Sequence, residues 1–219
     1  MQLMIASSNA GKVREIREYF SDLPIEVLTI RDVFGDNLPE EPIENSSTFK
    51  GNALLKAVYY SERANLPCLA DDSGLCVDGL GGFPGVYSHR FAITEDNPNP
   101  TDEDRNLLLI KMMRENGLDE SFAQYKCAMA LVNPLRAHRD GNFFTERVLY
   151  GKIKSTPSGT NGFSFDPYFY LKEYDYAKTC ADITLQEKNR ISHRALAMKD
   201  VKDFLIALER RDVMASPCT

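Results

Sequence analysis

The pattern of apolar and polar positions in the first third of the chain predicts two strands and two helices. The apolar residues 3–6 form a short run typical of a buried strand, and residues 26–30 predict a second one. Between them, three helix-capping residue types at 7–9 precede apolar positions that recur at helical spacing over 13–23. After a polar loop, a heptad-like spacing of apolar positions predicts a second helix over 48–65.

The middle of the chain predicts a third strand, a third helix and a pair of longer strands. Residues 68–70 form an apolar strand that runs into the tetrapeptide 71–74, whose residue types favour a turn. An amphipathic helix is expected over 102–116. Residues 122–132 and 142–153 are rich in β-branched and aromatic side chains, which predicts a hairpin.

The last part of the chain predicts a short strand over 168–171 and a helical region over 184–211, opened by a capping box of Thr184 and Glu187. Strands and helices alternate early, whereas paired strands come later. The expected fold class is therefore α/β, with a mixed, elongated central sheet and flanking helices. At ~150 residues per domain, the length predicts one domain over 1–219, made of two lobes with an active-site cleft between them.

Composition and charge narrow the classes of partner. With 43% hydrophobic and 26% charged residues, the chain has an ordinary globular composition. Its 26 basic and 32 acidic residues give a net charge of −6, which disfavours non-specific binding to nucleic acid or to an acidic membrane surface. An anionic small molecule is compatible with this charge only in a pocket where positive groups gather.

The cysteines and the apolar stretches indicate where the protein acts. Its five cysteines are scattered without the spacing of a metal site, which fits a reducing compartment. No signal-peptide core is recognisable, and no apolar run approaches the ~20 residues of a membrane span. We therefore expect a soluble cytoplasmic protein that binds neither nucleic acid nor membranes.

Three groups of residues are candidates for chemistry. The turn at 7–12 leads into a helix and offers unpaired backbone N–H groups to a phosphate, although an ordinary capped surface helix would look the same. The acidic pair 71–72 with Glu44 suits magnesium, which prefers one or two protein carboxylates; an ordinary turn is the alternative. Lys188 with residues 192–194 forms a basic group, or simply an exposed helix face.

Six motifs, in the same order along the chain, resemble those of the inosine triphosphate pyrophosphatase (Ham1-like) family. They are S-x-N-x-x-K at 7–12, E-x-x-x-T-F-x-x-N-A-x-x-K-A at 44–57, A-D-D-S-G-L-x-V-D at 70–78, P-G-V-Y-S-x-R-F at 84–91, G-F-x-F-D-P at 162–167 and K-N-x-x-S-H-R at 188–194. One match would be weak, whereas six in order are specific. The resemblance implies a homodimeric enzyme that hydrolyses the non-canonical purine nucleoside triphosphates ITP, dITP and XTP to the monophosphate and pyrophosphate, cleansing the nucleotide pool.

The resemblance also implies the parts of the site. One Mg²⁺ per site would be held by Glu44 and Asp72, and Asp72 would be the catalytic residue that orients or deprotonates the attacking water. Phe163 would stack on the base, and donors around the purine edge would accept the oxygen at C6 of hypoxanthine or xanthine. The implied substrate-binding residues are Ser7, Ser8, Asn9, Ala10, Gly11, Lys12, Lys56, Ser73, Phe163, Ser164, Phe165, Asp166, Lys188, His193 and Arg194.

Three positions depart from the family pattern, and two glutamates are candidates for one of the metal ligands. Gly51 stands where the family often has an acidic residue, while Ser164 and Phe165 replace the common Gly and Tyr of the base-binding loop. Glu44 is chosen as the metal ligand because its distance from the following helix start fits the motif, and Glu41 is the alternative.

Two other functions are open on the sequence. One is a pyrophosphatase for other modified nucleotides, such as damaged pyrimidines, which a panel of substrates would separate from the first. The other is a nucleotide-binding regulator that lacks catalysis. The acidic pair with Glu44 argues against the regulator, because a pure binder has no need of acidic metal ligands.

Overall fold

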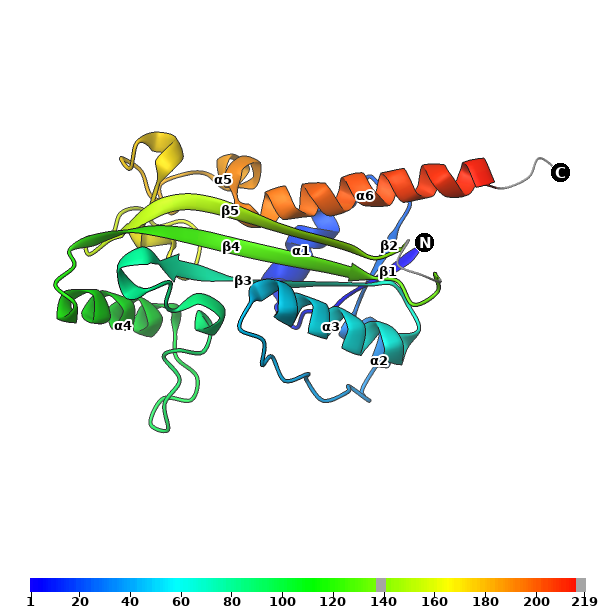
Figure 1. Cartoon of the computed structure of the whole chain (residues 1–219), viewed down its shortest axis with the longest axis horizontal. Coiled ribbons are helices and arrows are strands. Elements are labelled where there is room, and N and C mark those ends of the chain that lie inside the picture. Colours follow the sequence, from blue (N-terminus) through cyan, green and yellow to red (C-terminus); the bar gives the residue numbers. More distant parts are fainter. Residues whose placement is uncertain (137–140, 216–219) are drawn as a thin grey trace. The chain divides into compact units, whose positions relative to one another are not determined.

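The central element of the protein is a mixed β-sheet (Figure 1). The computed structural model describes residues 1–136 and 141–215, apart from the side chains of Ala10 and of residues 212–215. Within that part, six strands lie in the order β2-β1-β3-β4-β5-β6. They are β1 (Gln2–Ile5), β2 (Glu26–Thr29), β3 (Cys68–Val77), β4 (Glu120–Val132), β5 (Phe143–Lys154) and β6 (Phe169–Leu171).

Both parallel and antiparallel pairs occur in this sheet. Strand β1 runs parallel to β2 and to β3, whereas β6 runs antiparallel to β5. The two strands predicted to form a hairpin, β4 and β5, are neighbours in the sheet. The expected α/β class with a mixed sheet is therefore confirmed.

Four of the six helices of the described residues begin close to where the sequence predicts a helix start. The helices are α1 (Ala10–Tyr19), α2 (Ile30–Phe34), α3 (Phe49–Ala64), α4 (Asp102–Glu115), α5 (Leu185–Ile191) and α6 (His193–Ala215). Thr48, Thr101 and Thr184 each accept a hydrogen bond from a backbone N–H in the first turn of the helix that follows. The short helix α2 was not predicted from the sequence, although its capping box of Thr29 and Asp32 is complete.

Two predictions of local structure are wrong. Residues 71–74 do not form a turn, because β3 continues through them to Val77. Asp71 and Asp72 remain extended because Lys12 and Asn52, distant in sequence, hold their carboxylates. The predicted helical region after Thr184 is not continuous either: Ser192 has an extended backbone and separates α5 from α6.

The chain divides into two compact units. The first comprises Met1–Asp72, Ala128–Glu146 and Ala197–Thr219, and the second comprises Ser73–Cys127 and Arg147–Leu196. The division cuts β3 immediately after Asp72, so this strand contributes residues to both units.

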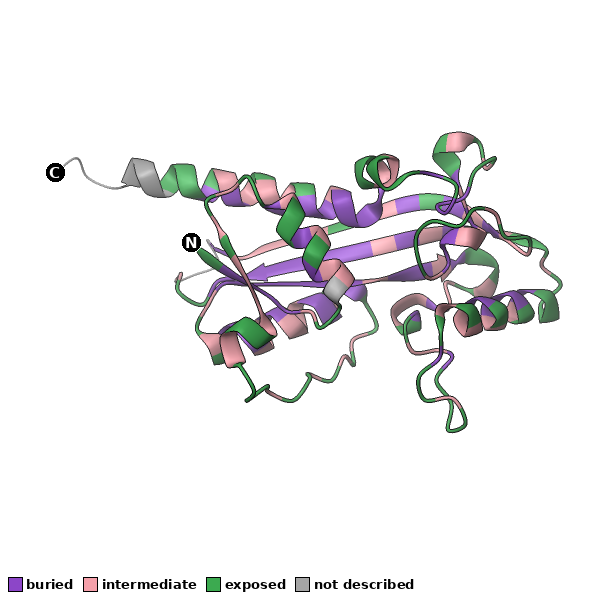
Figure 2. Ribbon diagram, turned by 180° about the vertical axis from the view of Figure 1, so that it is seen from behind, coloured by how far each residue is buried: buried purple, intermediate pink, exposed green. Residues whose placement is uncertain are grey.

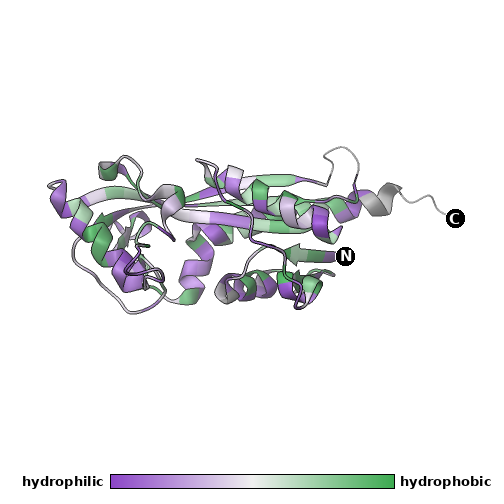
Figure 3. Ribbon diagram, turned by 90° about the horizontal axis from the view of Figure 1, so that it is seen from below, coloured by the Kyte–Doolittle hydropathy of each residue, from purple (hydrophilic) through white to green (hydrophobic). Residues whose placement is uncertain are grey.

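The core of the first unit is built from β1, α1 and α3. Leu3, Met4 and Ile5 of β1 are fully buried, as are Ile16 of α1 and Ala53 and Ala57 of α3. Figure 2 shows the buried residues running along the strands, and Figure 3 shows helices that carry both hydrophilic and hydrophobic positions. Asn52, a polar residue of α3, is also fully buried.

The second unit has a separate apolar core. Leu109 and Met113 of α4 lie in one buried cluster with Leu75 and Val77 of β3 and with Phe169 of β6. Among the described residues, no helix is long and apolar enough to cross a lipid bilayer. Cys68, Cys76, Cys127 and Cys180 form no disulfide bond, and Cys218 lies outside the described residues.

Candidate functional site

The turn between β1 and α1 has the geometry expected of a helix N-terminus. Asn9 caps α1 by accepting a hydrogen bond from the backbone N–H of Lys12 at 3.1 Å, and its own N–H donates to Ser7 Oγ. Ser8 and Asn9 are exposed, so the start of the helix is open to solvent. The side chain of Ala10 is outside the described part. This turn can receive an anion through its N–H groups and the positive end of the helix dipole.

A cluster of two lysines and three carboxylates lies in the first unit. Lys12 Nζ is 2.7 Å from Asp71 Oδ2, and the Asp71 carboxylate is almost completely buried. Lys56, from α3, has Nζ 2.8 Å from Glu44 Oε1. Burial alone would lower the pKa of Lys56, but the negative charges of Asp71, Glu44 and Asp72 outweigh it and raise the pKa. Lys56 is therefore held as a cation among these carboxylates, which we call the carboxylate–lysine cluster (Lys12, Glu44, Lys56, Asp71 and Asp72).

Asp72 is a carboxylate of this cluster whose pKa is strongly shifted. Burial raises its pKa to about 6, Glu44 and Asp71 add to the increase, and Lys56 and a hydrogen bond from Asn52 oppose it. Asn52 Nδ2 donates to Asp72 Oδ2 at 3.0 Å. A buried carboxylate with a pKa near neutrality is typical of a functional group, because it can exchange a proton at physiological pH.

The two adjacent aspartates have different partners, as strand geometry requires. Asp71 contacts Lys12 of α1, whereas Asp72 contacts Asn52 of α3, because successive side chains of a strand point to opposite faces. Among the described residues, no group of three or more Asp, Glu, His or Cys side chains is gathered closely enough to hold a metal. Magnesium commonly takes only one or two carboxylates from protein, so a magnesium site of that size does not need a group of three such side chains.

The positions of Glu44 and Glu41 differ. Glu44 pairs with Lys56 and its charge acts on Asp72, whereas the charge of Glu41 acts on Tyr60. Burial raises the pKa of Tyr60 to about 12, with Glu41 contributing. This arrangement favours Glu44 as the second carboxylate.

The departure from the family pattern at Gly51 has a steric cause. A Cβ at this position would lie 2.0 Å from Ser46 Oγ. Ser46 is itself fixed, because its backbone N–H donates to Asn52 Oδ1 at 2.9 Å. A side chain at position 51 would displace Ser46, so the local structure requires glycine there.

The second unit gathers basic side chains around one exposed aromatic ring. Phe163 is 51% exposed, and Lys188 Nζ lies 4.7 Å from the centroid of its ring. Arg194 is farther away, with Cζ 6.0 Å from the same centroid. Asp166, which is buried, accepts hydrogen bonds from the backbone N–H of Phe163 and from Lys188 Nζ. An exposed ring with fixed cations beside it can stack on a planar ligand that carries acceptors at its edge.

The start of α6 adds two buried polar side chains to this unit. His193 and Arg194 are each 8% exposed. The imidazole of His193 stacks on the ring of Tyr125, with centroids 5.0 Å apart, and Arg194 Nη2 donates to Ser73 Oγ at 3.2 Å. Tyr125 was missed in the sequence because it stands among the apolar residues of a buried strand and carries no motif.

The loop of residues 162–166 places the side chain of one predicted site residue in the core. Phe165, predicted to bind substrate, is only 2% exposed, and its ring packs against Phe91 in the core. The side chain therefore anchors the loop instead of facing a ligand. Ser164 has a φ of +55°, a left-handed conformation that glycine adopts more easily, which gives a physical reason for the glycine that is common in the family.

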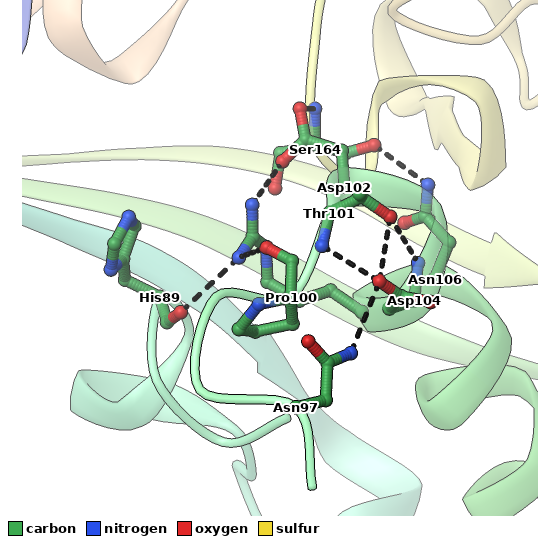
Figure 4. Close-up of polar contacts among 9 residues, drawn as sticks. His89, Asn97, Pro100, Thr101, Asp102, Asp104, Asn106 and Ser164 are labelled. Carbon is green, nitrogen blue, oxygen red and sulfur yellow. Dashed lines mark hydrogen bonds and ion pairs between the residues drawn. The ribbon is translucent and has the colours of Figure 1, made fainter. Parts of the chain in front are cut away.

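Two residues that contact Ser164 were missed by sequence reasoning. Asp102 and Asn106 of α4 hydrogen-bond to its backbone (Figure 4). The one available signal was a polar residue, Asn106, on the buried side of an amphipathic helix. Two cavities in the described part of the chain, of about 100 and about 240 Å³, are lined by none of the predicted site residues.

Comparison with known proteins agrees with the motifs. The model of the Ham1 family matches residues 3–204. The "dITP/XTP pyrophosphatase" of Thermoanaerobacter pseudethanolicus is 36% identical over 206 residues, which cover 94% of this chain and 97% of that protein. The protein of the same name from Geobacillus kaustophilus is 41% identical over 202 residues, which cover 90% of each.

Solved structures agree as well. A HAM1 protein from Coxiella burnetii superposes with a TM-score of 0.83 at 32% identity, covering 94% of this chain and 99% of that one. The Ham1 protein of Staphylococcus aureus gives a TM-score of 0.79 at 31% identity, with coverage of 94% and 99%. The chain belongs to the Ham1 family.

Proposed function

We propose that this protein is a hydrolase that converts ITP, dITP and XTP to the corresponding monophosphate and pyrophosphate, and so removes them from the nucleotide pool. The observation that carries the proposal is Asp72, a buried carboxylate with a pKa of about 6 beside Lys56 and Glu44. Membership of a family whose curated relatives are named dITP/XTP pyrophosphatases supports the choice of substrate.

The phosphates bind to the first unit in this proposal. Lys12 and Lys56 supply two cations within a protein of net charge −6, and the N-terminus of α1 adds backbone donors. Such positive groups offset the unfavourable overall field only locally, which favours a compact polyanion over an extended one. A nucleoside triphosphate meets that requirement better than a nucleic acid does.

A magnesium ion is proposed as the cofactor, held by Glu44 and Asp72. The donor set fits, because both ligands are hard carboxylate oxygens and magnesium takes its remaining ligands from water and phosphate. When bound, the ion would neutralise charge on the phosphate oxygens. The Mg²⁺ requirement is tested by titrating the metal-free enzyme with Mg²⁺ and with Ca²⁺.

The chemical step assigned to Asp72 is proton acceptance from the attacking water. In the metal-free protein, a pKa of about 6 leaves Asp72 mostly ionised at pH 7, so its carboxylate can accept a proton. Water attacks the α-phosphorus, the bond from the α-phosphorus to the bridging oxygen breaks, and pyrophosphate leaves with that oxygen. Lys12 and Lys56 stabilise the charge that develops on the phosphate oxygens.

In this proposal the base is recognised by Phe163 and the basic side chains around it. Phe163 stacks on the purine, and Lys188, Arg194 and His193 provide donors for the oxygen at C6. Adenine carries an amino group at C6, so a donor facing it would be left unpaired. Such a loss costs about 1 to 3 kcal/mol, which corresponds to tenfold to hundredfold discrimination per contact.

The decisive experiment is a substrate panel with magnesium that follows pyrophosphate and monophosphate release. ITP, dITP and XTP should be converted with a kcat/KM at least tenfold above that of ATP or GTP. Release of orthophosphate alone, or a preference for ATP, would overturn the proposal. A preference for damaged pyrimidine nucleotides would favour a pyrophosphatase for other modified nucleotides, and nucleotide binding without turnover would favour a regulator.

We also propose that the enzyme acts as a homodimer in the cytoplasm. The family resemblance motivates the dimer, and a reducing compartment is compatible with the four described cysteines, which form no disulfide bond. Light scattering coupled to gel filtration should give twice the chain mass of 24.7 kDa. A mass equal to one chain at micromolar concentration would contradict the dimer.

A further inference from the structure

Both backbone polar groups of Ser164 are held by side chains of α4 (Figure 4). Asp102 Oδ2 accepts a hydrogen bond from the Ser164 N–H at 2.8 Å, and Asn106 Nδ2 donates to the Ser164 carbonyl at 2.9 Å. The two side chains thus hold both the N–H and the carbonyl group of a single residue. We call this pair, Asp102 and Asn106, the α4 clamp.

Other contacts and burial hold the two residues of the α4 clamp in place. Arg105 Nη2 donates to the second oxygen of Asp102 at 2.6 Å, and Arg105 Nη1 donates to the Pro100 carbonyl at 2.8 Å. Asn106 is 7% exposed, and its Oδ1 has no hydrogen-bond partner among the described residues. Burying this unpaired amide oxygen is unfavourable. The favourable polar contact of the Asn106 side chain is the hydrogen bond from its Nδ2 to the Ser164 carbonyl.

Ser164 needs such support because of its backbone conformation. Its φ of +55° lies in the left-handed region, which is unfavourable for a residue other than glycine. The neighbours on its two sides differ sharply: Phe163 is half exposed, whereas Phe165 is buried in the core. The chain therefore turns outward at Ser164, and the backbone held there sets the direction in which the Phe163 ring points.

We propose that Asp102 and Asn106 are positioning residues for base recognition. They act through Ser164 to hold Phe163 beside Lys188 and Arg194, so that the stacking surface is already formed when the nucleotide arrives. Preorganisation of this kind increases affinity because less conformational freedom is lost on binding. The inference rests on the proposed function for the identity of the ligand, but the geometry of the clamp does not depend on it.

The informative variants separate positioning from stability. Asn106→Leu keeps most of the side-chain volume, removes the donor to Ser164 and also removes the unpaired oxygen, so the thermal midpoint should hold or rise. Asp102→Ala removes the acceptor. Glu103→Ala is the matched control, because Glu103 is an exposed acid in the same first turn of α4.

The kinetic readout uses ligands with and without a base. Each clamp variant should raise the KM for ITP and the inhibition constant of IMP about tenfold, while inorganic tripolyphosphate should inhibit within about twofold of wild type. Glu103→Ala should leave all three constants unchanged. The inference is overturned if the clamp variants behave like the control, or if inhibition by tripolyphosphate weakens in parallel.

A second readout needs no activity. The chain contains no tryptophan, so Phe163→Trp introduces a single fluorescent reporter at the ring that the clamp is proposed to hold. Adding Asn106→Leu to this variant should lower the fluorescence anisotropy and increase quenching by acrylamide, whereas adding Glu103→Ala should change neither. Unchanged anisotropy when Asn106→Leu is added would overturn the positioning role of the α4 clamp, even if ITP proves not to be the substrate. Absence of ITP turnover in wild type would count against the proposed function alone.

Discussion

Asn52 Nδ2 donates a hydrogen bond to Asp72 Oδ2 across 3.0 Å in the interior of the first unit. Asn52 is 0% exposed and Asp72 is 8% exposed. The amide oxygen of Asn52 accepts from the Ser46 N–H at 2.9 Å, so both ends of the side chain are fixed. This one residue therefore joins the loop before α3 to the carboxylate of β3, and it stabilises the ionised form of Asp72 against burial.

Removing that bond should make Asp72 a weaker acid. In Asn52→Ala, burial is no longer opposed by the amide donor, and hydrogen bonds to charged groups contribute about 1.5 to 3 kcal/mol. The acidic limb of the profile of kcat/KM against pH should therefore move to higher pH by about one unit or more. Asn45→Ala, a change at an exposed position of the same loop, is the control. If the acidic limb of Asn52→Ala stays at the wild-type pH, that limb does not report the titration of Asp72.

Replacing Asp72 by Asn tests catalysis directly. The variant keeps the shape of the side chain but cannot accept a proton, so kcat should fall roughly 10²- to 10⁴-fold while the nucleotide still binds. Isothermal titration and single-turnover assays measure the two effects separately. Asp36→Asn, in an exposed loop, should leave both unchanged. Full turnover in Asp72→Asn would refute the role given to this carboxylate.

The same carboxylate should reduce the stability of the metal-free protein at neutral pH. Its pKa is raised from 3.8 to about 6 in the folded state, so the folded state binds more protons than the unfolded chain between these values. The free energy of unfolding should therefore decrease as pH rises from about 4 to about 6, by up to about 3 kcal/mol. Urea titrations at several pH values measure the slope, and Asp72→Asn should flatten it. An equal slope in the variant would be the contrary result.

The choice between Glu44 and Glu41 as metal ligand can be settled by a matched pair of variants. Glu44→Gln should raise the Mg²⁺ concentration needed for half-maximal activity at least tenfold, because a neutral amide replaces one of two carboxylates. Glu41→Gln removes the same charge from the same loop and should leave the requirement unchanged. The reverse pattern would move the ligand to Glu41.

Two phenylalanines that are neighbours in the loop should respond in opposite ways. Phe163→Ala removes an exposed ring, so it should weaken ITP binding while changing the free energy of unfolding little. Phe165→Ala empties a buried position and should cost about 3 to 5 kcal/mol of stability. Chemical denaturation and KM values measured on both variants compare the effects. Equal loss of stability in the two would contradict the division of roles within the loop.

The predictable part of the fold consists of features encoded over a few residues. The helix starts at Thr48, Thr101 and Thr184 follow from a side chain that caps the next turn, and β1 follows from a short apolar run. The order of the six motifs also identified the family. Residue types at fixed spacing can be read from the sequence without knowing which residues the fold brings together.

The errors occur where contacts distant in sequence decide the conformation. The tetrapeptide at 71–74 has the composition of a turn, yet it stays extended because Lys12, 59 positions away from Asp71, and Asn52 hold the two carboxylates inside the sheet. The preference of these residue types for a turn is weaker than the stabilisation of the strand. That stabilisation comes from the backbone hydrogen bonds of the sheet and from the side-chain hydrogen bonds of the two aspartates.

By itself the sequence determined the class of fold, the starts of α1, α3, α4 and α5, the family and the residue types available for phosphate, metal and base. Only the tertiary structure decided which of them act on one another. It buried Asp72 and so raised the pKa of this carboxyl, although the hydrogen bond from Asn52 opposes the increase. It also turned Phe163 outward and Phe165 inward, and it set Asn106 against Ser164, 58 positions later in the chain. Burial and hydrogen bonds between distant segments depend on packing of the whole chain, which no short stretch of sequence encodes.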